Sequence, residues 1–412
     1  MTKVFWFVSA PLFSHTDWGG FLKTAQALQA LGHTVIWVSG ESLAPVIRSA
    51  GVRFESIPET GWLWPPPPAP DVTKMPPQEA VMLRYRRALD TWLSEDLVGE
   101  AVTHLIALSE RIGKPDMIVT DPFLTASALA AEFLETPLSV CGWVGMQDLQ
   151  EEHLFPVQKS LGQESQDRLQ RLCERFQISG SNFANGPTPS ILSPHLHISY
   201  FNAYWYQAEA PFLLDQNLFV GGMPETPLDA PPQWLQQIAP ETPLAFITLG
   251  TTFAGDLGFY SWAAQASARA GLLPVIALGS HPIVPEEKAK LITALPKATR
   301  LLNFVDFRHL LPRVQLMIHH GGMGTTHAAA VYGIPQIAVP HAADQRGNAR
   351  RIAQVKVGLS LTAHDVKQGM LFQGVSAIAR DEKVTAVAKQ LAQDLASLGG
   401  PPSAAQALLD VL

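Results

Sequence analysis

The chain has 412 residues with a formal net charge of -7, and 47% of its residues are hydrophobic against 16% charged. This composition excludes a disordered chain, the length predicts two domains, and the negative charge gives no basis for a nucleic-acid partner, which requires an excess of lysine and arginine. Two cysteines, Cys141 and Cys173, exclude a disulfide framework. No apolar run is long enough for a signal peptide or a membrane span, so we expect a cytoplasmic protein.

The first half of the chain alternates predicted strands and helices. Residues 4–8 form a continuous apolar run, which is typical of a strand covered on both faces. A helix over 21–31, ended by Gly32, and a strand over 35–38 complete a β–α–β unit, which implies a parallel sheet. The alternation continues with a helix over 46–50, a strand over 52–54, a strand over 117–120, a helix over 125–133 and a strand over 138–140.

Two proline-rich stretches interrupt this alternation. Residues 58–77 contain four consecutive prolines beside Trp62 and Trp64, and so exclude a helix or a central strand. Both a packed surface loop and a binding lid fit such a stretch. Prolines are dense again from 211 to 243, where we place a linker, 216–243, between a domain over 1–215 and a domain over 244–412.

The second half restarts the alternation. Its predicted elements are strands over 244–249, 274–278, 301–304, 315–319 and 337–339, and a helix over 259–270. The tail over 383–412 is helical with a break at Gly399-Gly400-Pro401-Pro402, and its last helix could pack back on the N-terminal domain. Two such halves predict a ligand at the carboxyl ends of the strands.

The segment His320-Gly321-Gly322-Met323-Gly324-Thr325 follows one of these strands and leads into a helix that we expect to begin near Thr325. Its glycines let the backbone approach a ligand closely, and the N–H groups of a helix N-terminus suit a diphosphate. The segment is neither a dinucleotide fingerprint nor a P-loop. His320 can donate a hydrogen bond to a phosphate oxygen. On these residues alone, a tight turn capped by Thr325 is an equal alternative.

The residues that follow this segment favour the diphosphate-binding loop over the tight turn, because together with it they resemble a known family. With Gly333-Ile334-Pro335, Pro340 and Asp344-Gln345, the segment resembles the donor site of the family 1 glycosyltransferases, whose pattern runs HxGxGT, GxPxxxxP and DQ. It is most similar to the bacterial natural-product (macrolide-type) branch, with sterol glucosyltransferases as relatives. The resemblance implies an α/β chain of the GT-B fold, with two Rossmann-like doubly wound domains facing each other across a cleft. The N-terminal domain would bind the acceptor and the C-terminal domain the nucleotide sugar.

The resemblance also assigns donor contacts. The carboxylate and amide of the DQ pair would bind sugar hydroxyls, backbone groups after the strand over 301–304 would meet the base, and the glycine-rich loop would hold the diphosphate. The donor-binding candidates are Thr251, Thr252, Phe304, Val305, His320, Gly322, Met323, Gly324, Thr325, Asp344 and Gln345. Ala328 stands where many relatives place a ribose-binding glutamate, so the choice between UDP and dTDP stays open.

The catalytic candidates are His15 and Asp121. Residues 11–15 are similar to the family's opening, where a loop histidine after the first strand is the general base, although this chain lacks the proline that usually follows. Thr120-Asp121-Pro122 looks like the segment that supplies its aspartate partner. An imidazole deprotonates a hydroxyl near neutral pH, and a carboxylate behind it fixes the tautomer. The structural alternatives are a loop role for His15 and a turn role for Asp121.

Aromatic residues of the N-terminal half are candidates for acceptor binding or, equally, for the core. They are Trp62, Trp64, Phe123 and Trp143, and Phe155 is a further candidate in or beside a predicted loop. His319 and His320 are adjacent, and His327 and His341 lack carboxylate or cysteine neighbours at the spacing of metal ligands, so we expect no metal site. The basic segment 84–87 fits a solvated helix face better than a membrane-binding one.

We therefore expect a hexosyltransferase that inverts configuration, needs no metal or other cofactor, and moves a hexose from a UDP- or dTDP-sugar to a hydroxyl of a hydrophobic small molecule. Its partners would be this donor and this acceptor, with the protein a monomer or a dimer. Two alternatives stay open: a nucleotide-sugar epimerase of the same architecture, and a non-catalytic nucleotide-sugar-binding activator. The first would show no acceptor dependence, and the second would bind the donor without turnover.

Overall fold

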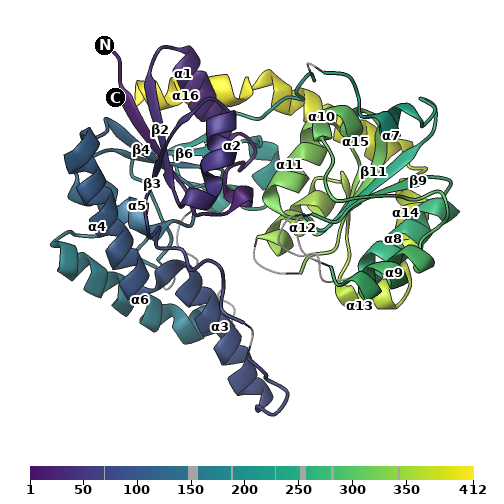
Figure 1. Ribbon diagram of the computed structural model, residues 1–412, viewed down its shortest axis with the longest axis horizontal. Helices are drawn as coiled ribbons and strands as arrows, with labels where there is room; N and C mark the ends of the chain where they lie inside the picture. Colours follow the sequence, from purple (N-terminus) through teal and green to yellow (C-terminus); the bar gives the residue numbers. More distant parts are fainter. Residues whose placement is uncertain are drawn as a thin grey trace. The chain divides into compact units, whose positions relative to one another are not determined.

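The computed structural model describes residues 1–68, 70–146, 156–186, 189–227, 229–250, 257–279, 283–341 and 344–412, with the backbone alone over 156–158. The chain divides into two compact units. The first unit comprises Met1–Ser199, Glu209–Val220 and Pro401–Leu412, and the second comprises Tyr200–Ala208 and Gly221–Gly400. Each unit is built on its own parallel sheet with helices around it (Figure 1), which confirms the predicted fold class of two Rossmann-like α/β domains.

The first unit contains a seven-stranded sheet in the order β3-β2-β1-β4-β5-β6-β7, and its described strand pairs are all parallel. The order reverses between β1 and β4, which is the switch point of a doubly wound sheet and the usual place for a ligand. The strands are β1 (Val4–Val8), β2 (Thr34–Ser39), β3 (Arg53–Ser56), β4 (Met117–Thr120), β5 (Leu138–Cys141), β6 (Leu196–Ser199) and β7 (Asn217–Phe219).

Alternating residues of β1 serve two separate cores, because successive side chains of a strand point to opposite faces. Trp6 and Val8 pack into the core that α4, α5 and α6 also line, and Phe7 packs on Phe21 and Trp37, with ring centroids 5.2 and 5.8 Å away. The helices of the unit are α1 (Phe21–Ala30), α2 (Ala44–Ser49), α3 (Pro77–Leu93), α4 (Glu95–Ile112), α5 (Thr125–Phe133), α6 (Pro156–Phe176) and α16 (Gly400–Asp410).

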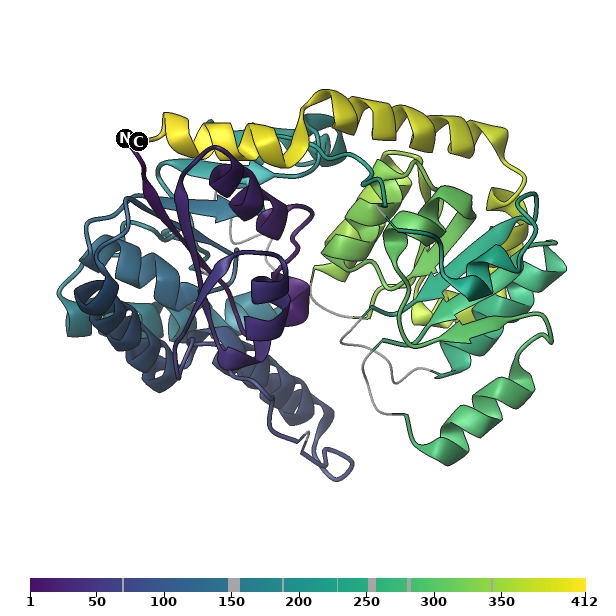
Figure 2. The same cartoon turned by 45° about the horizontal axis from the view of Figure 1, so that its top comes forward.

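The last helix belongs to the first unit from Pro401 onward. Ala404, Ala405 and Leu408 on α16 are fully buried. The chain therefore ends in the unit in which it begins, and its two termini lie side by side (Figures 1 and 2).

The described part of the proline-rich stretch over 58–76 forms turns and bends before α3 begins. Leu63 N donates to the carbonyl oxygen of Thr91 at 2.9 Å, so the start of the stretch is held against α3, while residues 65–68 are exposed. Within the basic segment of α3, Arg86 forms an ion pair of 3.4 Å with Glu164, and Arg87 donates to Pro67 O at 2.6 Å. In the part of the chain that the structure describes, no helix is both long and apolar enough to cross a membrane.

The second unit contains a six-stranded sheet in the order β10-β9-β8-β11-β12-β13, again with parallel pairs among the described strands. Its order reverses between β8 and β11. The strands are β8 (Leu244–Thr248), β9 (Leu273–Ala277), β10 (Arg300–Leu302), β11 (Val314–His319), β12 (Gln336–Ala338) and β13 (Gly358–Ser360).

Helices cover both faces of this sheet, with one apolar core on each face. The predicted helical tail forms α15 and α16. The break between them lies at Leu398–Gly399, and the residues Gly400, Pro401 and Pro402 of the predicted break begin α16 instead. The helices of the unit are α7 (Gln233–Gln236), α8 (Leu257–Arg269), α9 (Pro285–Ala294), α10 (Phe307–Leu310), α11 (Met323–Val331), α12 (Gln345–Gln354), α13 (Ala363–Lys367), α14 (Met370–Ile378) and α15 (Glu382–Ser397).

The segment Tyr200–Ala208 directly follows β6 but belongs to the second unit. His327 donates from Nε2 to the carbonyl oxygen of Tyr200 at 2.8 Å, and the Arg351 guanidinium lies 4.7 Å from the ring centre of Tyr206. The predicted linker over 216–243 contains β7, which pairs with β6, and the helix α7. The domain limits at 215 and 244 stay a prediction.

Candidate active site

His15 and Asp121 meet at the switch point of the first sheet. His15 ends a short 3-10 turn (Phe13–His15) that follows β1, and Asp121 follows β4 directly. The His15 Nδ1 and Asp121 Oδ2 atoms are 3.2 Å apart. Asp121 is fully buried and His15 is only 7% exposed. The two residues that the sequence proposed as base and partner, 106 positions apart in the chain, are therefore in hydrogen-bonding contact.

Backbone groups orient the Asp121 carboxylate. Its Oδ2 also accepts from Ala10 N at 2.8 Å, and its Oδ1 accepts from Phe123 N at 2.9 Å. Because an ionised carboxylate can only accept, the proton of a neutral His15 ring lies on Nδ1. In this tautomer Nε2 carries no proton, so Nε2 is the atom of the ring that can accept a proton from a substrate hydroxyl.

Aromatic rings surround His15. The Trp18 and Trp62 rings both lie edge-on to the imidazole, each with its centroid 4.9 Å away. The contacts continue from Trp18 to Phe123 at 5.6 Å and from Phe123 to Trp143 at 5.7 Å. Three of the four predicted acceptor residues thus join one aromatic cluster with the base.

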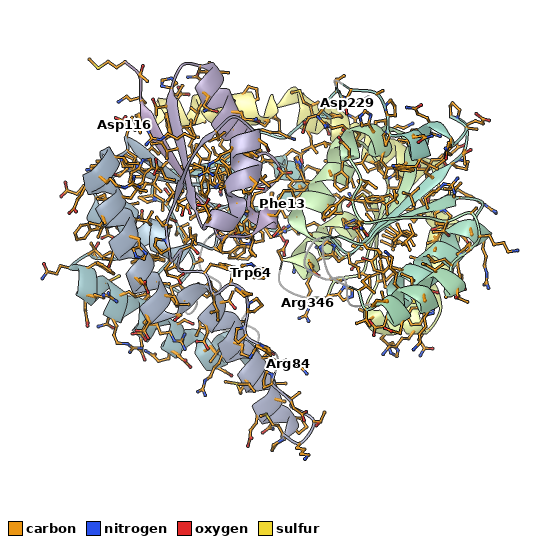
Figure 3. All side chains as sticks on the ribbon, viewed as in Figure 1. Phe13, Trp64, Arg84, Asp116, Asp229 and Arg346 are labelled. Carbon is orange, nitrogen blue, oxygen red and sulfur yellow. The ribbon has the colours of Figure 1, made fainter. Side chains whose placement is uncertain are left out.

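The fourth predicted acceptor residue, Trp64, is 43% exposed two positions after Trp62, and Phe13 in the turn of His15 is 56% exposed; both are labelled in Figure 3. Phe155 lies outside the described residues. Trp18 was not predicted as a site residue. Its position three residues after the proposed base, in the same loop, is the signal that could have found it.

Glycines shape the loop after β11 in the second unit. Gly321 has a φ of +85°, which favours glycine, and a Cβ there would lie 2.9 Å from the Gln345 carbonyl oxygen. The His320 ring fills the space beside Gly322 and beside Gly250, which follows β8; a Cβ at Gly250 would lie 2.7 Å from its Cε1 atom. The helix α11 begins at Met323, two residues before the predicted start. The loop therefore lies at the switch point between β8 and β11.

Two consecutive histidines of this loop are held neutral. Burial lowers the pKa of His319 to about 4, and burial together with the neighbouring His319 and His341 lowers the pKa of His320 to about 3. His319 donates from Nε2 to Gln336 Oε1 at 3.0 Å and accepts from Gly321 N at Nδ1 at 3.0 Å, which fixes the turn. A neutral His320 can give a hydrogen bond to a ligand without adding charge, so the positive potential of this site comes from the α11 N-terminus.

Asp344 and Gln345 lie at the start of α12 and contact the same loop. Asp344 Oδ2 accepts from Met323 N, the first N–H of α11, and from Asn348 Nδ2, both at 3.1 Å. Gln345 Oε1 accepts from His341 N at 2.8 Å. Asn348 was not predicted as a site residue, although it donates to the Gly321 carbonyl at 2.9 Å. Its spacing of four from Asp344 on one helix face could have indicated it.

The remaining predicted donor residues have mixed positions. Phe304, just after β10, is 61% exposed, and Val305 is half-buried against an apolar core. Gly324 and Thr325 lie half-buried in the first turn of α11. Thr251 and Thr252 lie outside the described residues. Among the residues described, no group of three or more histidine, cysteine, aspartate or glutamate side chains could hold a metal ion.

The chain is similar to known glycosyltransferases. Residues 280–411 match the family described as "Erythromycin biosynthesis protein CIII-like, C-terminal domain". L-demethylnoviosyl transferase of Streptomyces niveus is 32% identical over 181 residues, 43% of this chain and 46% of that protein. NDP-glycosyltransferase YjiC of Bacillus subtilis is 23% identical over 405 residues, 97% of this chain and 94% of that protein. The chain thus spans about half the length of the first relative and nearly all of the second.

Solved structures agree over the full chain. The glycotransferase of kitacinnamycin has a TM-score of 0.77 at 20% identity and covers 100% of both chains. The spinosyn rhamnosyltransferase SpnG complexed with thymidine diphosphate has a TM-score of 0.69 at 20% identity and covers 99% of this chain and 100% of that one. At such identities the structures establish the GT-B fold. All these relatives and structural neighbours are glycosyltransferases.

Proposed function

We propose that this chain, whose residues 280–411 match the erythromycin CIII-like C-terminal domain, is a glycosyltransferase of the GT-B type that transfers a hexose from a UDP- or dTDP-sugar to a hydroxyl of a hydrophobic natural product. The contact between His15 Nδ1 and Asp121 Oδ2 at the switch point of the first sheet carries the proposal. It leaves a basic Nε2 atom beside aromatic rings, where a flat hydroxylated acceptor can bind.

In the proposed reaction the acceptor hydroxyl gives its proton to His15 Nε2 as its oxygen attacks the anomeric carbon of the donor. A carbon–oxygen bond forms to the acceptor while the bond to the diphosphate breaks, and the nucleoside diphosphate leaves with the bonding electrons. The proton stays on the imidazolium, which Asp121 stabilises. A single displacement of this kind inverts the configuration of the sugar.

The leaving diphosphate needs stabilisation of its negative charge. The first-turn N–H groups of α11, such as those of Gly324 and Thr325, supply partial positive charge, and the neutral His320 supplies a hydrogen-bond donor. These groups do the work that a metal ion does in other transferases, so we propose a reaction without metal and with no cofactor besides the donor substrate. Asp344 and Gln345 would bind the sugar hydroxyls, and the backbone at Phe304 and Val305 the base.

The relatives support the substrate classes without fixing them. The thymidine diphosphate named in one neighbour favours dTDP-sugars, and "NDP-glycosyltransferase" leaves the base open. The acceptors in the names are natural products. Sterols enter the proposal only as one acceptor class among several.

A screen tests the proposal. Aromatic, polyketide, sterol and carotenoid alcohols would each be incubated with UDP-glucose and dTDP-glucose, and glycosides detected by mass spectrometry. We expect transfer to at least one apolar class, and transfer only to simple sugars or peptides would contradict the acceptor class. Conversion of the donor without any acceptor would favour the epimerase, and donor binding without turnover would favour the activator.

A further inference from the structure

A glycine-containing loop at 142–146 follows β5 and carries Trp143. Gly142 has a φ of +93°, and a Cβ at this position would overlap the Trp18 side chain. Gly142 N donates to the Ile198 carbonyl oxygen of β6 at 2.8 Å. The loop backbone thus presses directly on Trp18, whose ring touches His15.

His197, on β6, contacts this loop through a hydrogen bond and by packing against its backbone. It is buried, and burial lowers its pKa to about 4, so the ring is neutral. Its Nε2 accepts from Ser193 N at 3.0 Å, and its Nδ1 donates to the Trp143 carbonyl oxygen at 3.3 Å. The ring also lies 3.2 Å from where a Cβ of Gly145 would be, so the loop rests on the imidazole.

Asn217, on β7, fixes the other end of the loop. Its Oδ1 accepts from Gly145 N at 2.6 Å, and its Nδ2 donates to the Gly145 carbonyl oxygen at 2.7 Å and to that of Leu214 at 2.8 Å. The loop is therefore held by hydrogen bonds to His197 on β6 and Asn217 on β7, which follow Trp143 and Gly145 by 54 and 72 positions in the chain.

We propose that His197 and Asn217 are positioning residues for acceptor binding: they set the placement of Trp143, and through the Phe123 and Trp18 rings the aromatic surroundings of His15. Neither residue touches substrate in this proposal. The inference rests on the proposed function, in which these rings bind the acceptor. Because the two side chains contact only the acceptor half of the site, their loss affects acceptor binding and leaves donor binding unchanged.

Two substitutions of His197 separate a positioning role from a stabilising one. The Nδ2 atom of an asparagine stands where Nδ1 of the imidazole stood, so His197→Asn keeps the bond to Trp143 and loses the one from Ser193. A glutamine reaches only the Nε2 position, so His197→Gln keeps the Ser193 bond and loses the Trp143 bond. Each variant loses one buried hydrogen bond and should show a similar loss of thermal stability.

The assay measures KM for the hydroxyanthraquinone alizarin, KM for UDP-glucose, and kcat. We expect His197→Gln to raise the acceptor KM by roughly tenfold, the effect of one buried hydrogen bond, with the donor KM unchanged, and His197→Asn to stay near the wild-type value. Asn217→Ala should raise the acceptor KM as His197→Gln does. Its control is Asn182→Ala, which removes one buried side-chain bond of 2.9 Å to Ala128 O in the same unit, against three for Asn217, and should lower stability alone.

Equal acceptor KM values in His197→Asn and His197→Gln would overturn the positioning role. An unchanged acceptor KM in Trp143→Ala would overturn it as well, because the residue being positioned would then not bind the acceptor. Failure of the proposed function would show itself differently, as an absence of transfer by the wild-type enzyme. In that case quenching of tryptophan fluorescence by alizarin, compared across the same variants without donor, decides the inference on binding alone.

Discussion

Substitutions at His15 and Asp121, made singly and together, perturb one hydrogen bond of 3.2 Å. His15→Ala removes the proposed base, and a loss of this kind lowers the transfer rate by roughly 10²–10⁴-fold. Nucleotide affinity should not change, because the proposed donor residues belong to the second unit. His33→Ala is the matched control: this histidine accepts from Lys3 N at 3.1 Å and should leave the transfer rate unchanged.

Asp121→Asn tests the charge behind the base. At 3.2 Å and an effective dielectric constant of about 20, a carboxylate and an imidazolium attract each other by about 5 kcal/mol. Loss of this attraction in Asp121→Asn can therefore lower the transfer rate by at most between about three and four orders of magnitude. An amide loses this attraction. Its NH2 group must also face the N–H of either Phe123 or Ala10, which lowers the free energy of unfolding by about 1–3 kcal/mol.

The double variant decides whether the two residues act as one unit. We expect it to lose much less activity than the product of the two single losses, since Asp121 contributes through the imidazolium that His15→Ala removes. Initial rates with alizarin and calorimetric nucleotide binding would be measured for all four proteins. Multiplicative losses, or wild-type rates in His15→Ala, would refute the reasoning. His15→Ala should keep the largest fraction of wild-type activity with thiol acceptors, because a thiol is more acidic than an alcohol and depends least on a base.

Three further predictions follow from the same geometry. His320→Ala should weaken UDP or dTDP binding by about 1–3 kcal/mol, while the exposed His364→Ala of the same unit should not; equal affinities by calorimetry would remove His320 from the site. Activity should survive EDTA, and NMR should show an inverted anomer, whereas a retained anomer would exclude a single displacement. The folded-state pKa values of His197, His319 and His320 lie below the ordinary 6.5, so the unfolded chain binds more protons below that pH. Stability is therefore full above pH 6.5 and should fall by roughly 2 kcal/mol per histidine between pH 7 and 5; urea unfolding with the same midpoint at both pH values would contradict it.

The sequence predicted those parts of the fold that local patterns encode. Asp121 and His320 directly follow the apolar runs of β4 and β11, and His15 lies in the loop after β1, so finding the strand ends also located these residues. The amphipathic α4 was not predicted, although Val98, Val102 and Leu105, all fully buried, repeat at helical spacing. The three-residue strand β7 was missed because it lies in a proline-dense stretch.

The supporting residues could not be predicted, because their contacts depend on strand order. His197 meets Trp143 only because β6 lies next to β5, and Asn217 reaches Gly145 only because β7 adds to that edge. The local sequence around His197 does not indicate a contact with Trp143, and the local sequence around Asn217 does not indicate a contact with Gly145. The same holds for Trp62, which meets His15 through a loop whose path no periodicity describes.

The return of α16 to the first unit has a consequence for how the protein is made. Synthesis proceeds from the N-terminus, and domains of a nascent chain generally fold in that order. The first unit receives Ala404, Ala405 and Leu408 only from its last twelve residues, Pro401–Leu412, which leave the ribosome after the whole second unit. Until then its nascent form lacks those buried side chains and exposes the apolar surface that they cover. A chain that ends at Gly400 therefore lacks the buried side chains of α16 and should be less stable in its first unit than the chain with α16.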